Sequence, residues 1–152
     1  MRSLALLLVV LLPALLLSSC KNMEVRMQDG FYSAEIAEFD EHGWKEYITI
    51  YVSENTIVTV DYNAKNGSGF IKSWDMEYMQ LMNRDDGTYP NKYAREYAEA
   101  LINQQTPNRV DAISGATHSF VTFQALARAA IQQAYAGDTK LIYVDLTGVT
   151  GE

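Results

Sequence analysis

The feature of this chain that most constrains its fold is a change of hydrophobic periodicity near the middle of the sequence. In the first half, apolar and polar residues alternate in three stretches, as in half-buried strands, with the apolar positions at Tyr32, Ala34, Ile36, Ile48, Ile50, Val52, Val58, Val60 and Tyr62. Short polar breaks at 40–43 and 53–55 predict antiparallel hairpins between these strands. In the second half the spacing becomes helical. Strands followed by helices predict a single α+β domain, an antiparallel β-sheet packed against helices.

The helical half divides at its turn residues. A short helix is expected from a Ser73 cap to Met82, with Met76, Met79 and Leu81 partly buried. Pro90 opens a second helix whose core-facing stripe is Ala94, Tyr97, Ala98 and Leu101. A long third helix begins at Thr117 and ends at Gly137, with its apolar face at Phe120, Phe123, Ala127, Ala130, Ile131 and Ala134. Residues 141–146 form a candidate final strand.

The first twenty residues predict export and lipidation. Arg2 precedes about fourteen largely apolar residues, fewer than the about twenty that a membrane span needs, and a bacterial lipobox follows and ends at Cys20. We therefore expect a signal peptide at 1–19, a lipidated tether at 20–28 and one domain at 29–152. Two or three acyl chains, palmitate for example, hold a protein durably on a bilayer. The alternatives are an uncleaved anchor or a secreted protein with a chance cysteine.

The net charge and the cysteine count exclude some classes of partner and an internal cross-link. The formal net charge is −7, so no basic stripe is available for nucleic acid, and attachment to anionic lipid has to come from the acyl group on Cys20. Because Cys20 is the one cysteine, an internal disulfide is excluded.

A short motif lies at the start of the long helix. Asp111 is followed by Ser114, Gly115, Ala116 and Thr117, which puts a hydroxyl behind a small-residue turn where unpaired N–H groups and the helix dipole favour an anion. A structural interpretation has Ser114 or Thr117 merely capping the helix. Asp111 either assists a reaction at this place or closes an Asx-turn.

This motif resembles the flavinylation motif of FMN-binding domains, which occur in the flavin subunits of sodium-translocating quinone reductases, in Rnf-type complexes and in small exported lipoproteins. The resemblance extends over 29–32, 43–45, 56–58 and 61–66, and the cleavable leader is typical of the lipoprotein branch. It implies that a flavin transferase using FAD joins FMN covalently to the hydroxyl of Thr117 through a phosphoester bond. Ser114, Gly115, Ala116 and Asp111 are then the other cofactor-binding positions.

The resemblance implies an electron carrier more than an independent enzyme. The sequence holds no dinucleotide-binding glycine loop, no haem or iron–sulfur cysteine set, no zinc spacing and no nucleophile with an evident base, so no catalytic or metal residues are expected. Donor and acceptor are then separate: a membrane quinone- or flavin-linked donor, and an exported acceptor, on the extracytoplasmic side of the cell membrane. The alternatives are a surface lipoprotein binding module without covalent flavin, and noncovalent FMN held by Ser114 and backbone N–H groups.

Two segments are candidates for contact with the flavin ring. The loop 63–70 contains two glycines that permit close approach to a planar group. The second candidate is a soft cluster of Met76, Tyr78, Met79 and Met82. His118, directly after the acceptor, and His42 are interpreted as surface histidines.

Overall fold

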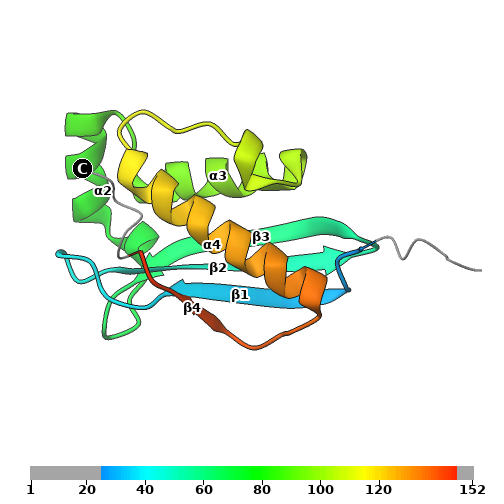
Figure 1. Cartoon of the computed structure of the whole chain (residues 1–152). Helices are drawn as coiled ribbons and strands as arrows, with labels where there is room; N and C mark the ends of the chain where they lie inside the picture. The colour runs from blue at the N-terminus through cyan, green and yellow to red at the C-terminus, as the bar shows by residue number, and fades with distance from the viewer. Residues whose placement is uncertain (1–24, 147–152) are drawn as a thin grey trace, which may run out of the picture.

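The computed structural model describes residues 25–146 and has a sheet on one side and helices on the other (Figure 1). The predicted signal peptide and Cys20 lie outside the described residues. The strands are β1 (Gly30–Ile36), β2 (Lys45–Ser53), β3 (Thr56–Lys65) and β4 (Ile142–Val144). The helices are the 3₁₀ turns η2 (Lys72–Trp74) and η3 (Pro107–Arg109) and the α-helices α2 (Met76–Asp86), α3 (Pro90–Gln104) and α4 (Thr117–Ala136).

The predicted α+β class and single domain are confirmed. The sheet has the order β3-β2-β1-β4, with β2 antiparallel to both β1 and β3 as the polar breaks predicted. Helices α3 and α4 pack on the same face of this sheet and bury the alternating apolar side chains of the strands. The largest fully buried side chains in this layer include Tyr32, Ile48, Tyr97, Phe123 and Leu126.

The sheet is mostly antiparallel, but β4 pairs with β1 in parallel. The reason lies at the C-terminal end of α4. The backbone N–H of Gln28, just before β1, donates to the carbonyl of Ala134 over 2.9 Å, and β4 follows the same end of that helix. Both strands therefore start at the same edge of the domain and run in the same direction.

Strand β3 departs from the predicted phase at its start. Val58 was expected to face the core, yet its side chain is 46% exposed, whereas Ile57 is buried. A β-bulge causes the change, because Tyr51 pairs with Thr59 and the next residue of β2 pairs with Ile57. The unpaired extra residue, Val58, moves to the outer face, and Tyr62 then points inward as predicted.

Helix α2 begins two residues later than predicted, when the observed N-cap is compared with the predicted Ser73 cap. Its N-cap is Asp75, whose carboxylate accepts the N–H of Tyr78 over 3.0 Å. Ser73 belongs to the preceding turn η2, is buried, and accepts a hydrogen bond from the Asn63 amide over 2.8 Å. Met79 is half-buried as expected, but Met76 and Leu81 are exposed, because α2 lies at the end of the sheet with only part of one face covered (Figure 1).

Helices α3 and α4 match their predictions closely. Pro90 is the first residue of α3, and Gly137 ends α4 in the left-handed conformation at φ 68°. The predicted stripes of both helices belong to the core except for Ala98, which is half-buried outside it, while Tyr93 joins the buried face of α3. Between residues 25 and 146 no helix combines the length and the apolarity needed to cross a membrane.

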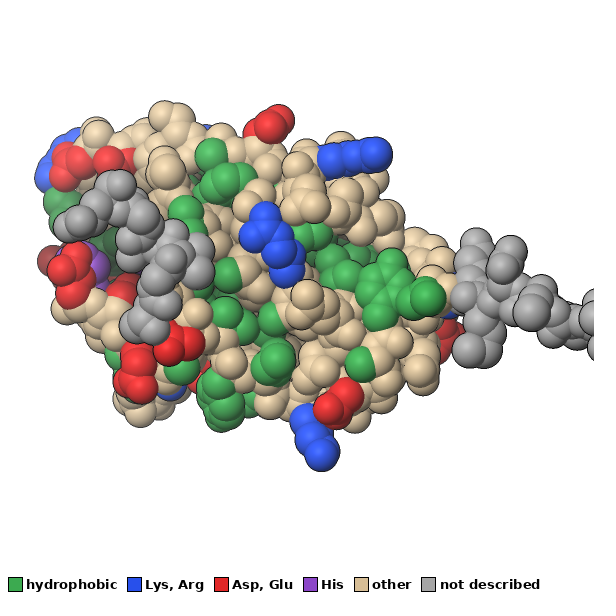
Figure 2. All heavy atoms as spheres, in the orientation of Figure 1, with side chains coloured by type: hydrophobic (Ala, Val, Ile, Leu, Met, Phe, Trp, Pro, Cys, Tyr) green, Lys and Arg blue, Asp and Glu red, His purple; other side chains and the backbone are tan. Residues whose placement is uncertain are grey.

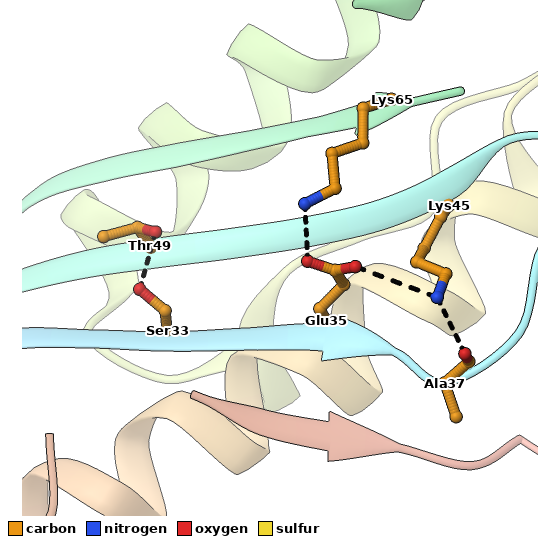
Figure 3. Close-up of polar contacts among 6 residues, drawn as sticks. All are labelled: Ser33, Glu35, Ala37, Lys45, Thr49 and Lys65. Atoms are coloured by element: carbon orange, nitrogen blue, oxygen red, sulfur yellow. Dashed lines mark hydrogen bonds and ion pairs between the residues drawn. The ribbon is translucent and has the colours of Figure 1, made fainter. Parts of the chain in front are cut away.

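The other face of the sheet carries a polar group, drawn in Figure 3, and also the stacked rings of Phe31 and Tyr51. Glu35 on β1 pairs with Lys65 of β3 at 2.7 Å and with Lys45 of β2 at 3.9 Å. Beside this group, the hydroxyls of Ser33 and Thr49 share a hydrogen bond of 2.8 Å between neighbouring strands. The charge of Glu35 is thus paired within the sheet.

Candidate functional site

The predicted motif forms the turn that leads into α4. Thr117 is the first residue of the helix and is exposed, as are Asp111, Ser114 and Gly115, whereas Ala116 is buried. Ala116 is the N-cap, and no side chain caps the helix. The interpretation of Ser114 or Thr117 as a helix cap is therefore wrong, and both hydroxyls remain at the surface.

Gly115 is required by the local geometry. Its φ of +78° lies in the left-handed region, which residues with a Cβ rarely adopt. A Cβ at this position would lie 2.7 Å from the carbonyl oxygen of Asp86 and 3.1 Å from Cγ2 of Thr88. The turn before α4 is thus packed directly against the connection between α2 and α3.

Two buried tyrosines hold this turn and the first turn of the helix. The Tyr97 hydroxyl accepts the N–H of Ile113 over 3.0 Å and donates to the carbonyl of Ala116 over 3.2 Å. The Tyr62 hydroxyl donates to the carbonyl of Ser119 over 2.8 Å. The sequence predicted both residues for the core, but their hydrogen bonds to the motif depend on long-range contacts that periodicity does not reveal.

The start of α4 is the positive end of a helix dipole, and the nearby Glu46 carboxylate bonds to the side chain of Ser119 in its first turn. The first backbone bond into the helix is donated by Phe120 to Ala116 over 3.0 Å, so within the described residues the N–H groups of Thr117, His118 and Ser119 have no backbone acceptor. The first turn contains no acidic residue. Such an end stabilises an anion attached at Thr117.

A pocket of about 530 Å³, here named the α4 pocket, lies at the start of α4, where Gly115, Ala116, His118 and Ser119 line it and Thr117 does not. Segments far apart in the sequence form it: the loop 40–42, η2, α2, α3 and the start of α4. Its side-chain walls include Lys72, Tyr78, Met82, Tyr93, His118 and Ser119. Ligand pockets of drug-sized molecules span roughly 300–1,000 Å³, so the space is adequate for a planar flavin ring. Figure 2 shows acidic and histidine side chains gathered at this end of the molecule.

The lining of the α4 pocket includes residues from only one of the two segments that were predicted to contact the flavin ring. Tyr78 and Met82 of the soft cluster line it. The loop 63–70 does not, because Asn66 folds it back on itself: the Asn66 carboxamide oxygen accepts the N–H groups of Ser68 and Phe70, each over 3.0 Å. Turn η2, which follows the loop, reaches the pocket in its place.

A smaller pocket of about 280 Å³ adjoins the first, and Asp40 and His118 line both. Its floor includes Glu46, which is 9% exposed. Glu46 Oε1 accepts the Ser119 hydroxyl over 2.9 Å, while Oε2 is buried and has no hydrogen-bond partner among residues 25–146. Burial raises the pKa of Glu46 above its usual value, against the effects of Ser119 and of the cation of Lys72.

Sequence reasoning did not single out Glu46 or Lys72. For Glu46 a sign was available, because it precedes Ile48 and Ile50 at the spacing of the inward face of β2. Lys72 follows a glycine-containing loop and has no such pattern. Its ammonium group is buried by packing against Trp44 and Tyr78, and burial lowers its pKa, opposed by Glu46 and Asp40.

His42 is exposed, and its Nε2 lies 3.5 Å from a carboxylate oxygen of the neighbouring Glu41. His118 is also exposed, at the rim shared by the two pockets. Among residues 25–146 no three His, Cys, Asp or Glu side chains are grouped so that they could hold a metal ion.

Known proteins resemble this chain in sequence and in fold. The FMN-binding domain family matches residues 43–132. A protein of Treponema pallidum (strain Nichols) named 15 kDa lipoprotein is 37% identical over 129 residues, which cover 85% of this chain and 90% of the relative. The crystal structure of the CPE2226 protein from Clostridium perfringens superposes with a TM-score of 0.76 at 36% identity, covering 79% of this chain and 98% of that protein. The family match covers more than half of the sequence and includes the whole motif, so this chain belongs to the FMN-binding domain family and FMN is its cofactor at the family level.

Proposed function

We propose that this protein is a membrane-anchored, extracytoplasmic electron carrier whose FMN is joined by a phosphoester bond to Thr117. The observation that carries the proposal is the position of Thr117, exposed on the first residue of α4 between neighbours that line a pocket with room for a flavin. In the attachment step, the Thr117 oxygen attacks the FMN phosphorus of FAD on a flavin transferase. The bond between the two phosphates breaks, AMP leaves, and the hydroxyl proton passes to the transferase.

The residues around Thr117 fit the product of that reaction. Its phosphate is an anion, and the unpaired N–H groups and dipole at the start of α4 favour an anion there. Gly115 and Ala116 keep the approach free of large side chains, and Ser114 and Asp111 are exposed nearby. The bound flavin supplies the redox chemistry, while the protein positions it and surrounds it with charge.

Lipidation at Cys20 completes the proposal. The similar Treponema pallidum protein is named a lipoprotein, which supports the lipobox interpretation for this chain. Gln28, at the end of the tether, bonds to the C-terminal turn of α4, whereas Thr117 begins that helix. A 20-residue helix is about 30 Å long, so the flavin site lies at the end of the domain away from the tether (Figure 1).

This arrangement suits a carrier that meets separate partners. The acyl group keeps the domain at the membrane, where a quinone- or flavin-linked donor supplies electrons, and the exposed far end presents the flavin to an exported acceptor. A covalent bond also keeps the cofactor from being lost by dilution outside the cell, since occupancy no longer depends on affinity.

The test is expression of the exported full-length protein together with an active flavin transferase. We expect flavin fluorescence in the denatured gel band and an intact mass increased by one FMN. Thr117→Ala removes both, whereas His118→Ala, the adjacent exposed position, retains both. A dark band for the wild-type protein from a verified active transferase contradicts the proposal. Yellow cofactor released on denaturation indicates noncovalent FMN, and no flavin by either route indicates a binding module of the same fold.

A further inference from the structure

Lys72 is a buried cation in the wall of the α4 pocket. Its side chain comes from η2, and the residue is 7% exposed. The ammonium nitrogen lies 5.2 Å from the ring centroid of Tyr78 and 5.8 Å from that of Trp44. Within residues 25–146 it makes no ion pair to a carboxylate within 4.0 Å.

Two other lysines of the sheet region differ from Lys72 because each has a carboxylate partner. Lys45 and Lys65 both pair with Glu35 on the outer face. Lys72 is more buried than Lys65, yet it has aromatic faces in place of a carboxylate partner. A buried charge is costly unless it is paired, so an ammonium held in a pocket wall without a direct partner is suited to an anion that enters the pocket.

The shape of the α4 pocket indicates which anion this is. The phosphate on Thr117 belongs at the exposed start of α4, where the N–H groups are. The space next to Lys72 is bounded by Tyr78, Tyr93 and Met82, which suits a flat aromatic group. The oxidised flavin ring is neutral. When it takes two electrons and one proton, it carries one negative charge; a quinol donor releases its second proton to solvent.

We propose that the ammonium group of Lys72 faces the flavin ring in the α4 pocket and raises its reduction potential by stabilising the negative charge of the reduced ring. This inference rests on the proposed function. Lys72 is a tuning residue and takes no part in attaching the flavin. The charges that act on Lys72 are Glu46 and Asp40, and the other charged or titratable groups in the pocket wall are Glu41, His42, Tyr78, Tyr93 and His118.

The expected effect is measurable. A unit charge a few ångströms from the ring, at the effective dielectric constant of about 20 that suits protein sites, changes the equilibrium for reduction by roughly tenfold or more. For a two-electron couple, a tenfold change corresponds to about 30 mV. Removing the Lys72 charge is therefore expected to lower the potential by about 30 mV or more.

The experiment uses the full-length protein, loaded with FMN by the transferase, and measures the reduction potential by equilibrium titration with a reference dye. The variants are Lys72→Met, which keeps the length of the side chain without its charge, and Lys140→Met, an exposed control beyond the far end of α4. A third variant, Lys72→Met/Met82→Lys, moves the charge to another wall of the same pocket. Circular dichroism and thermal unfolding verify that each variant is folded.

We expect Lys72→Met to contain FMN by mass but to have a lower potential, Lys140→Met to match the wild type, and the double variant to recover at least half of the difference. A folded, loaded Lys72→Met with unchanged potential overturns the inference and leaves the proposed function intact, even if its FMN content falls. If Lys72→Met does not fold, an unchanged potential in Met82→Lys alone overturns it. If the wild type itself takes no flavin, the mass measurement refutes the proposed function, and the inference falls with it.

Discussion

Replacing Gly115 by alanine probes the contact on which the position of Thr117 depends. Gly115 has φ +78°, and an added Cβ would lie 2.7 Å from the Asp86 carbonyl oxygen and 2.9 Å from the Asp86 Cβ. Real Cβ atoms do not approach backbone so closely, so either the turn before α4 or the connection after α2 has to move. A movement of this turn displaces the hydroxyl of Thr117 two residues later.

The magnitude follows from two separable costs. A residue with a Cβ in the left-handed region costs about 1–2 kcal/mol. Forcing an extra methyl group into packed surroundings costs about 1–3 kcal/mol more. Gly43 supplies a matched control, because its φ is +79° and a Cβ there would meet nothing within 4 Å. We therefore expect Gly115→Ala to lose about 2–5 kcal/mol of unfolding free energy and Gly43→Ala to lose only the first cost.

The assay is urea unfolding of both variants and the wild type, followed by circular dichroism, with FMN loading measured by mass in parallel. The difference between the two variants isolates the close approach, since their φ angles are nearly equal at +78° and +79°. Equal losses in Gly115→Ala and Gly43→Ala would refute the reasoning, because the turn would then not be packed against the α2–α3 connection. Gly115→Ala is also expected to load less FMN than Gly43→Ala.

Three further predictions follow from the same geometry. Burial raises the pKa of Glu46 above 4.5, so the folded state holds the carboxyl proton more tightly than the unfolded state does. The free energy of unfolding therefore falls as the pH rises from about 4.5 through the folded pKa. Urea titrations at several pH values should show a smaller decline in Glu46→Gln than in the wild type, and an identical pH profile contradicts this. Tyr97→Phe leaves the N–H of Ile113 without its acceptor and should cost about 1–2 kcal/mol in urea unfolding, whereas the exposed Tyr135→Phe should be neutral. Cys20→Ser should leave the protein unacylated, so that it appears in the soluble fraction after export and fractionation; persistence in the membrane fraction contradicts lipidation at this residue.

Local features of the sequence predicted most of the secondary structure. Alternation placed β1 and β2 in the correct phase, and Pro90 and Gly137 marked the start of α3 and the end of α4. These predictions succeeded because a strand or helix buried on one face repeats its apolar residues at a spacing set by backbone geometry alone. The motif at 111–117 was recognised for a similar reason, since a small-residue turn before a helix is a local pattern.

Other features depended on contacts between distant segments. The bulge that turns Val58 outward arises from pairing with β2, and β4 runs parallel to β1 because both strands begin beside the end of α4. Asp75 caps α2 because Ser73 is bonded to Asn63 of β3 in the buried turn η2. No single segment carries the information for these outcomes.

The difference between what the sequence determines and what the tertiary structure determines is clearest at the candidate functional site. By itself the sequence determined the hydroxyl of Thr117, its place on the first turn of a helix and the small-residue turn before it. Only the tertiary structure decided what surrounds the start of that helix: a pocket in which the loop 40–42, Lys72 and the side chains of α2 and α3 meet the residues on either side of Thr117. Periodicity records which side of an element is buried, whereas a pocket is a shared boundary of several elements, and its position depends on how they pack in three dimensions.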